Sequence, residues 1–416
     1  MPYDMGPIDP DWRSRIDQRF TSLRGFAALT VMLAHYQYSE LLPIGFLPSA
    51  PVFKYSGQYG VMVFFFLSSF LLSHSLASDP NWTARPHLSL IAYSINRVFR
   101  ILPLLFVVIA LTFWNPSSFF PSSVGYWEEL RRSLTLGEAP GALWTIPVEL
   151  TFYLYLPIVL AVAAGATRSR CGAALLGSAY LAWCVAIALA RRNGAPASLW
   201  MTLGFHHYAN SFVGGVLFYA LLANGRIRFP RCGACIAWIA PIGFLCAYPF
   251  LYFALFRGDP SMAELARPGA WISYYDAVFP IAPLVVGGVI YGLLHPSASP
   301  LSRIMRTRGL RKIGELSFGV YLVHIPMVVF FGSHFGYGQW QCCASIAATF
   351  AAAAVLSALI ERPGIALGRD FGRWALTGAG NEARVGGEVL LDAHSRSAGP
   401  CGTPIRPPKI FLIDAV

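Results

Sequence analysis

About ten long stretches of this sequence are each apolar enough to cross a membrane, and this feature limits the fold most. A spanning helix needs about 20 mostly apolar residues. The stretches lie at residues 21–42, 59–78, 98–114, 142–163, 172–190, 200–222, 236–256, 277–294, 314–332 and 342–360. Charged residues make up only 12% of the 416 residues, about half the share in soluble domains, so they cannot cover a globular surface. We therefore predict an all-α, polytopic transmembrane bundle of about ten helices.

The basic residues indicate the orientation of this bundle. They lie in short clusters between the apolar stretches, as topology signals and lipid-headgroup contacts do. With the N-terminus in the cytoplasm, the inner segments hold 19 lysines and arginines and the outer segments hold 7. This asymmetry favours ten spans with both termini cytoplasmic. It also explains the net charge of +11 by contact with the lipid bilayer, without nucleic acid as a partner.

Outside the apolar stretches the chain offers little sign of a further domain. We expect residues 1–20 to form a cytoplasmic N-terminal segment, residues 21–365 a single transmembrane domain, and residues 366–416 a disordered cytoplasmic tail. Cys232 and Cys235 form an isolated CxxC pair with no second pair, so we expect no metal site. The sequence indicates no oligomeric state.

Two ionisable residues of the first stretch, Arg24 and His35, stand out because charged or imidazole groups are costly in hydrocarbon and usually functional. They are eleven residues apart, which is close to three full helical turns, so both side chains point to one side of the helix. Their separation along the axis is about 16 Å. Arg24 could instead be an anchor that reaches the headgroups, and His35 could simply satisfy a neighbouring helix.

A buried carboxylate, Glu149, is expected at the same depth as His35. It follows Trp144 by five residues, about seven residues into the fourth stretch from the outer side. A carboxylate beside a neutral imidazole can raise its basicity and fix its tautomer, as a general base requires. We therefore predict a His35–Glu149 pair, with a structural ion pair as the alternative.

Further polar residues are candidates for the same site. Arg97 and Arg100 share a helix face at the cytoplasmic end of the third stretch and could hold phosphate groups, or act as anchors. Tyr321 and His324 lie at mid-membrane depth in the ninth stretch, where they could line the cavity of His35 or bond across helices. Ser68 and Trp144 are further candidates for the cavity wall.

Six motifs in order resemble the acyltransferase 3 family, the membrane O-acyltransferases that modify bacterial cell-surface sugars. The resemblance covers about residues 20–365. It rests on Arg24 followed by ten residues and then His35, the run Gly60–Phe70, Arg97-x-x-Arg100, Trp144-Thr145 with Glu149, Phe152 and Tyr153, Tyr321-Leu322-Val323-His324-Ile325-Pro326, and Glu361 with Pro363.

The resemblance implies an enzyme of the bacterial cytoplasmic (inner) membrane. Its co-substrate would be acyl-CoA, most simply acetyl-CoA, with no permanently bound cofactor, and its acceptor a carbohydrate hydroxyl. Arg97, Arg100 and Arg24 would bind the donor, and His35, Glu149 and Arg24 would act in catalysis. The alternative is a polytopic secondary transporter or exporter with an intramembrane His/Glu site, which would move substrate without consuming acyl-CoA.

Overall fold

The computed structural model describes residues 16–38, 57–114, 143, 145–192, 208–229, 235, 282–296, 299–336 and 338–391. Within these residues every regular element is a helix, as the sequence predicts, and none is a strand. The helices are α1 (Ile16–Tyr38), α2 (Gly57–Ala77), α3 (Asn81–Ala84), α4 (Pro86–Trp114), α7 (Thr145–Ala166), α8 (Arg170–Arg192), α10 (Ala209–Ala223), α15 (Pro300–Ile304), α16 (Arg308–Glu315), α17 (Ser317–Phe335), α18 (Gln339–Leu356), the π-helical turn η5 (Ser357–Glu361) and α19 (Arg362–Leu391). A further apolar helix covers Ala282–Leu294.

Five segments of the described residues are long and apolar enough to cross a membrane. They are Gly57–Ala77, Pro86–Leu111, Thr145–Ala166, Ser317–Phe335 and Gln339–Leu376. Shorter apolar helices occupy Arg170–Ala186, Ala209–Ala223 and Ala282–Leu294, which fall in three more of the expected stretches. The chain is an integral membrane protein. The expected span 236–256 lies outside the described residues, so the total of ten and the cytoplasmic placement of both termini stay predictions.

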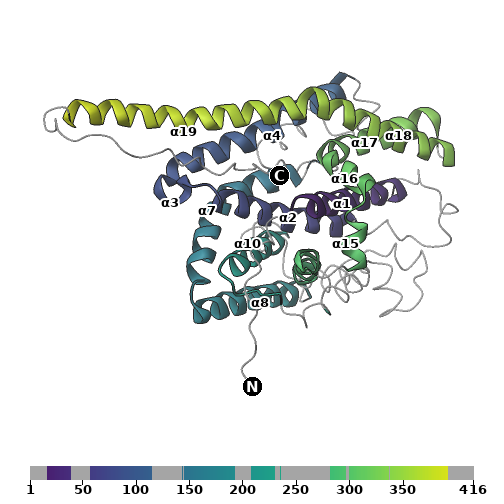
Figure 1. The fold of residues 1–416 in the computed structure, drawn as a ribbon. Coiled ribbons are helices and arrows are strands. Elements are labelled where there is room, and N and C mark those ends of the chain that lie inside the picture. The colour runs from purple at the N-terminus through teal and green to yellow at the C-terminus, as the bar shows by residue number, and fades with distance from the viewer. Residues whose placement is uncertain are drawn as a thin grey trace.

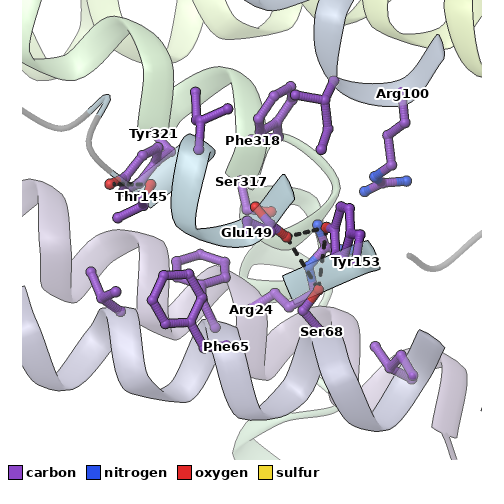
Figure 2. A pocket seen from close by; sticks show the side chains of 15 residues that line it. Arg24, Phe65, Ser68, Arg100, Thr145, Glu149, Tyr153, Ser317, Phe318 and Tyr321 are labelled. Atoms are coloured by element: carbon purple, nitrogen blue, oxygen red, sulfur yellow. Dashed lines mark hydrogen bonds between the residues drawn. The ribbon is translucent and has the colours of Figure 1, made fainter. Parts of the chain in front are cut away.

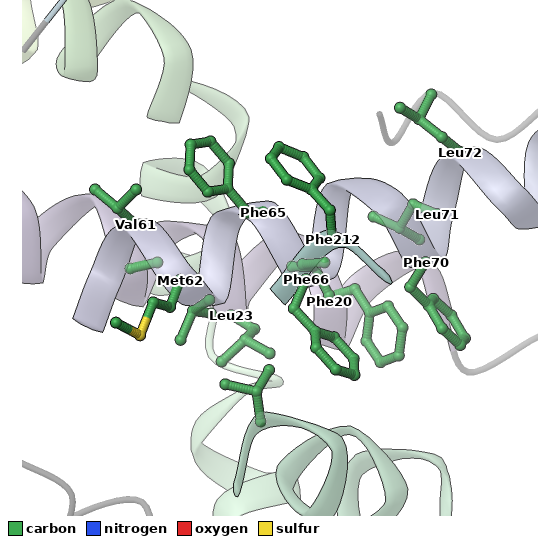
Figure 3. Close-up of a cluster of buried hydrophobic side chains, with 14 of the residues drawn as sticks. Phe20, Leu23, Val61, Met62, Phe65, Phe66, Phe70, Leu71, Leu72 and Phe212 are labelled. Atoms are coloured by element: carbon green, nitrogen blue, oxygen red, sulfur yellow. The ribbon is translucent and has the colours of Figure 1, made fainter. Parts of the chain in front are cut away.

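Helix α2 lies at the centre of the bundle. In its most apolar stretch 78% of the residues are buried, against at most 44% in the other four spans. Figure 3 shows its side chains meeting those of α1 and α10 in one cluster. The ring of Phe212 stacks between Phe65 and Phe152, at centroid distances of 4.3 and 3.9 Å, and joins α10 to α2 and α7. Helix α7, by contrast, carries large exposed apolar side chains such as Leu154 and Ile158, as expected of a surface that faces lipid, while α2 lies in the interior.

The C-terminal helix α19 extends into the segment that was expected to be a disordered tail. It runs along α4 in Figure 1 and continues to Leu391, so residues 366–391 are helical. Gly364, Gly368 and Gly372 bring the first part of this helix close to the main chain of α4, and this packing favours the helix there. Residues 392–416 of the expected tail lie outside the described residues.

A close backbone crossing fixes α1 against the amphipathic helix α16. A Cβ atom added at Gly314 of α16 would collide with the main-chain carbonyl group of Thr21 in α1. At Gly309 of the same helix, an added Cβ would meet nothing within 4 Å. The crossing places the start of α17, which follows α16 directly, beside the segment of α1 that carries Arg24.

This crossing predicts opposite effects of two alanine substitutions in α16. Gly314→Ala should destabilise the protein by about 1–3 kcal/mol, because the helices must separate to admit the methyl group. Gly309→Ala should have no such cost, because alanine is the better helix former at an open position. Thermal unfolding of the purified protein in detergent measures both. Equal transition temperatures for the two variants would contradict the crossing.

Candidate functional site

A mainly apolar cavity with several polar groups opens between five helices, α1, α2, α4, α7 and α17 (Figure 2). Its space for water-sized groups is ≈ 80 Å³, enough for about five water molecules. Val61, Phe64, Phe65 and Ile146 form part of its apolar wall. The polar lining residues are Arg24, Ser68, Arg100, Thr145, Glu149, Tyr153, Ser317 and Tyr321.

Glu149 holds two hydroxyl groups at one wall of this cavity. Its Oε1 accepts a hydrogen bond from Ser68 Oγ at 3.2 Å and another from the Tyr153 hydroxyl. Glu149 and Tyr153 are four residues apart, so they share one face of α7. Ser68 comes from α2, and its Oγ lies 3.5 Å from the Tyr153 hydroxyl. The three side chains thus form one network that links α2 to α7.

Two arginines from different helices meet at the same cavity. Arg24 comes from α1 and Arg100 from α4, and both line the wall. Arg97 lies one turn earlier on α4 and acts electrostatically on both of them. The carboxylates of Glu361 and Glu149 both attract Arg24. The cavity therefore combines fixed positive charge with nearby countercharge, an arrangement that suits an anionic ligand.

Two histidines form a pair beside the cavity. His324 Nε2 lies 3.1 Å from His35 Nδ1, and the ring centroids are 4.9 Å apart. His324 is fully buried and His35 partly buried. Neither residue lines the cavity itself. The pair joins α1 to α17.

This pairing corrects the predicted contact between His35 and Glu149. The ring contact of His35 is with His324, whereas Glu149 contacts Ser68 and Tyr153. The sequence gives the depth of a residue in the membrane, but not the rotation of one helix about another. Residues at similar predicted depth consequently belong to two neighbouring clusters.

The main chain favours one tautomer for both histidines. Their Nδ1 atoms lie 2.9 Å from the Val31 carbonyl oxygen and 3.1 Å from that of Val320, each one turn earlier in its own helix. A carbonyl oxygen can only accept, so the proton belongs on Nδ1. The single Nδ1–H of His35 is then shared between the Val31 carbonyl oxygen and His324 Nε2, both of which accept. His35 Nε2 keeps its lone pair, as a general base requires.

Tyr321 connects the histidine pair to the cavity. Its ring centroid lies 5.7 Å from that of His324, three residues later on α17. Its hydroxyl accepts a hydrogen bond from Thr145 Oγ1 at 2.9 Å, at the start of α7. Tyr321 thus separates the histidines from Glu149, which lies one turn beyond Thr145.

The structure brings most of the predicted site residues together. Arg24, Arg100, Glu149, Ser68 and Tyr321 line one cavity, and His35 and His324 lie beside it. Trp144 lies outside the described residues.

Three polar cavity residues were not predicted as site residues. Tyr153 and Thr145 both belong to the motif around Glu149, and Tyr153 could also have been found by helical spacing, because it lies one turn after Glu149. Ser317 carries no comparable signal, since isolated hydroxyls are common in membrane helices.

The described part of the chain holds no group of three or more His, Cys, Asp or Glu side chains arranged as metal ligands. His35 and His324 form a pair without a third such ligand among those residues.

Comparison with known families assigns the chain. The profile of an acyltransferase domain, that of the acyltransferase 3 family, matches residues 17–360. The chain belongs to the acyltransferase 3 family. The match covers all five helices of the cavity and both histidines, so the site described above lies within the family domain.

Two curated relatives are similar to this acyltransferase. Peptidoglycan O-acetyltransferase OatA of Listeria monocytogenes is 23% identical over 378 residues, which cover 82% of this chain and 54% of the relative. The protein named "Putative acetyltransferase ORF330" of Acidianus two-tailed virus is 30% identical over 149 residues, 34% of this chain and 41% of the relative. The chain thus spans about half the length of the curated relatives it matches. No solved structure shows a significant match.

The Glu149 network predicts a role for the Tyr153 hydroxyl in acyl transfer. Tyr153→Phe should lower the transfer rate about tenfold, because Glu149 loses a donor in a buried site and its carboxylate can move toward Arg24. Tyr155→Phe is the matched control on the same helix, since the Tyr155 side chain is 42% exposed. Initial rates at saturating donor measure the effect. Equal rates for both variants would contradict a role for the network.

Proposed function

We propose that this membrane acyltransferase moves an acyl group, acetyl in the simplest case, from cytoplasmic acyl-CoA to a carbohydrate hydroxyl on the outer side. The observation that carries the proposal is the cavity in which Arg24 and Arg100 meet the Glu149 network, next to the His35–His324 pair. Membership of the acyltransferase 3 family favours this reading over a transporter with an intramembrane His/Glu site.

The arginines would hold the donor. A guanidinium group binds phosphate through two parallel hydrogen bonds, and three guanidinium groups act on one another at this cavity. Arg97 and Arg100 lie on one face of α4, where we expect the cytoplasmic side of the membrane. Because Arg24 and His35 are about 16 Å apart along α1, a donor with its phosphates at the arginines must extend toward the histidines. The pantetheine arm of CoA has a length of this order.

His35 would act as the general base. Its Nε2 removes the proton of the acceptor hydroxyl, whose oxygen attacks the thioester carbon. The carbon–sulfur bond then breaks, and the CoA thiolate takes the proton back from His35, which leaves an ester and free CoA. His324 would orient the imidazole of His35, the role predicted for Glu149. Glu149 would instead position Tyr153 and Ser68 and attract Arg24.

The proposed acceptor rests on the name of one relative, OatA, and on the expected orientation of the helices in the membrane. OatA is named for O-acetylation of peptidoglycan, a carbohydrate polymer of the cell wall. His35 lies near the end of α1 where we expect the outer face of a bacterial cytoplasmic membrane. A carbohydrate presented there could reach His35 without entering the cytoplasm.

A labelled-donor assay tests the proposed function. Membranes that contain the protein are incubated with [14C]acetyl-CoA, and label is measured in ester linkage to peptidoglycan and other surface carbohydrates. Alkali-labile label that depends on the protein is the expected result. Retention of all label in CoA, together with uptake or export of a small solute, would favour the transporter.

The general-base role predicts a large effect at His35. His35→Gln should lower the transfer rate by about 10²–10⁴-fold, the usual contribution of general acid–base catalysis, and leave acyl-CoA binding intact. His334→Gln is the control, because His334 is an exposed histidine at the end of α17. Rates with labelled donor measure both variants. A His35→Gln rate within a few-fold of the unmodified protein would refute the assignment.

The donor role predicts a different signature at Arg100. Arg100→Gln should raise the KM for acyl-CoA by roughly 10–100-fold, since a hydrogen bond to a charged group is worth about 1.5–3 kcal/mol. Arg303→Gln, at an exposed arginine of α15, controls for loss of positive charge elsewhere. An unchanged KM in Arg100→Gln would exclude a contact with the donor.

A further inference from the structure

A π-helical turn interrupts the long helix that begins at Gln339 and ends at Leu391. The turn, η5, covers Ser357–Glu361 between α18 and α19. Its local cause is Pro363, which has no N–H to bond the carbonyl group four residues earlier and whose ring would collide with that group. Such turns shift the register of the side chains, and they occur frequently at functional sites.

The turn places a carboxylate in the interior. Glu361 is only 5% exposed, although Leu359 before it is 66% exposed and Arg362 after it is also exposed. Glu361 Oε2 is buried and receives no hydrogen bond within the described residues. A charge in this position is costly unless another charge compensates it.

A glycine stripe holds Glu361 close to the arginines of α4. Gly364, Gly368 and Gly372 follow one another at four-residue spacing, a pattern that lets membrane helices approach at backbone distance. A Cβ added at Gly364 would lie 2.8 Å from the Phe99 carbonyl oxygen, and one at Gly368 would lie 2.8 Å from Phe99 Cβ. Phe99 stands between Arg97 and Arg100 in the sequence. These contacts therefore fix the position of α19 along its axis, relative to the part of α4 that carries Arg97 and Arg100.

The charge partners of Glu361 are cavity residues. The carboxylate of Glu361 attracts Arg24, as that of Glu149 does. It also attracts Arg100, which Arg24 and Arg97 repel. The three arginines and two carboxylates of this group leave one net positive charge. Glu361 thus offsets the repulsion between Arg24 and Arg100.

We propose that Glu361 is a positioning residue, whose carboxylate holds Arg24 and Arg100 together at the cavity and competes with the anionic donor for them. The inference rests on the proposed function, because the donor is the acyl-CoA assigned there. Glu361 touches neither reacting group; it acts through the arginines. When the donor binds, its phosphates attract Arg24 and Arg100 and so replace part of the attraction that Glu361 exerts on them.

The role predicts a split between KM and kcat in Glu361→Gln. Loss of the carboxylate removes the competitor, so the KM for acetyl-CoA should fall by roughly three- to tenfold. The arginines are no longer aligned, so kcat should fall at least about tenfold. Direct binding of CoA to the purified full-length protein should tighten in parallel. Glu361→Asp keeps the charge and should restore part of kcat and a KM near that of the unmodified protein.

Two comparisons make the experiment decisive. Glu315→Gln removes a partly exposed carboxylate that pairs with Arg311 and Lys312 on α16, and should leave both constants unchanged. Gly368→Ala disturbs the packing of α19 on α4 and represents a merely structural defect, with a lower unfolding temperature and weaker donor binding.

The outcomes separate this inference from the proposed function. Lower kcat with tighter CoA binding in Glu361→Gln supports it. Unchanged kcat and KM in Glu361→Gln would overturn it. A loss of stability and donor binding like that of Gly368→Ala would also overturn it, if Glu361→Asp did not relieve the loss. If the unmodified protein neither binds acetyl-CoA nor transfers its acetyl group, the proposed function itself fails.

Discussion

The compensation of buried charge is the constraint on which this structure depends. A guanidinium group in a membrane interior is tolerated only when countercharge and hydrogen-bonding groups surround it. Arg24 meets this condition through Glu361 and Glu149, which lie far from it and from each other in the sequence. The helices that carry these residues must therefore pack together before the site exists. The glycine contacts of α16 with α1 and of α19 with α4 allow that approach.

The same packing divides the site into two parts. The charged part lies in the cavity, where Arg100 and the Glu149 network face an apolar wall. The imidazole part lies beyond Tyr321, where His35 and His324 pair. Helix α17 belongs to both, because Tyr321 and His324 are one turn apart. In the proposed reaction, the anionic end of the donor occupies the first part and the acyl group reaches the second.

The sequence predicts the composition of the site better than its pairing. Hydropathy and periodicity locate the helices, and the cost of burying charge marks Arg24, His35 and Glu149. These rules give the depth of each residue but not the rotation of its helix, which is why His35 was assigned the wrong neighbour. The partner His324 was expected either to line the cavity of His35 or to bond across helices, and the structure shows the second arrangement.

Two other features could not be predicted for related physical reasons. The π-helical turn depends on how Pro363 is accommodated in a packed helix, and a proline can equally end or kink a helix. The first part of α19 is supported by contact with α4 around Gly364, Gly368 and Gly372, whereas the composition of this segment alone resembles a tail. In both cases tertiary packing decides between local alternatives.

The most direct test is a cryo-electron microscopy structure of the protein in lipid nanodiscs with a non-transferable thioether analogue of acetyl-CoA. We expect the phosphates at Arg97 and Arg100, and the acetyl mimic directed past Tyr321 toward the unprotonated nitrogen of His35. An analogue bound away from this cavity, or an imidazole of His35 turned toward the lipid chains, would contradict this expectation.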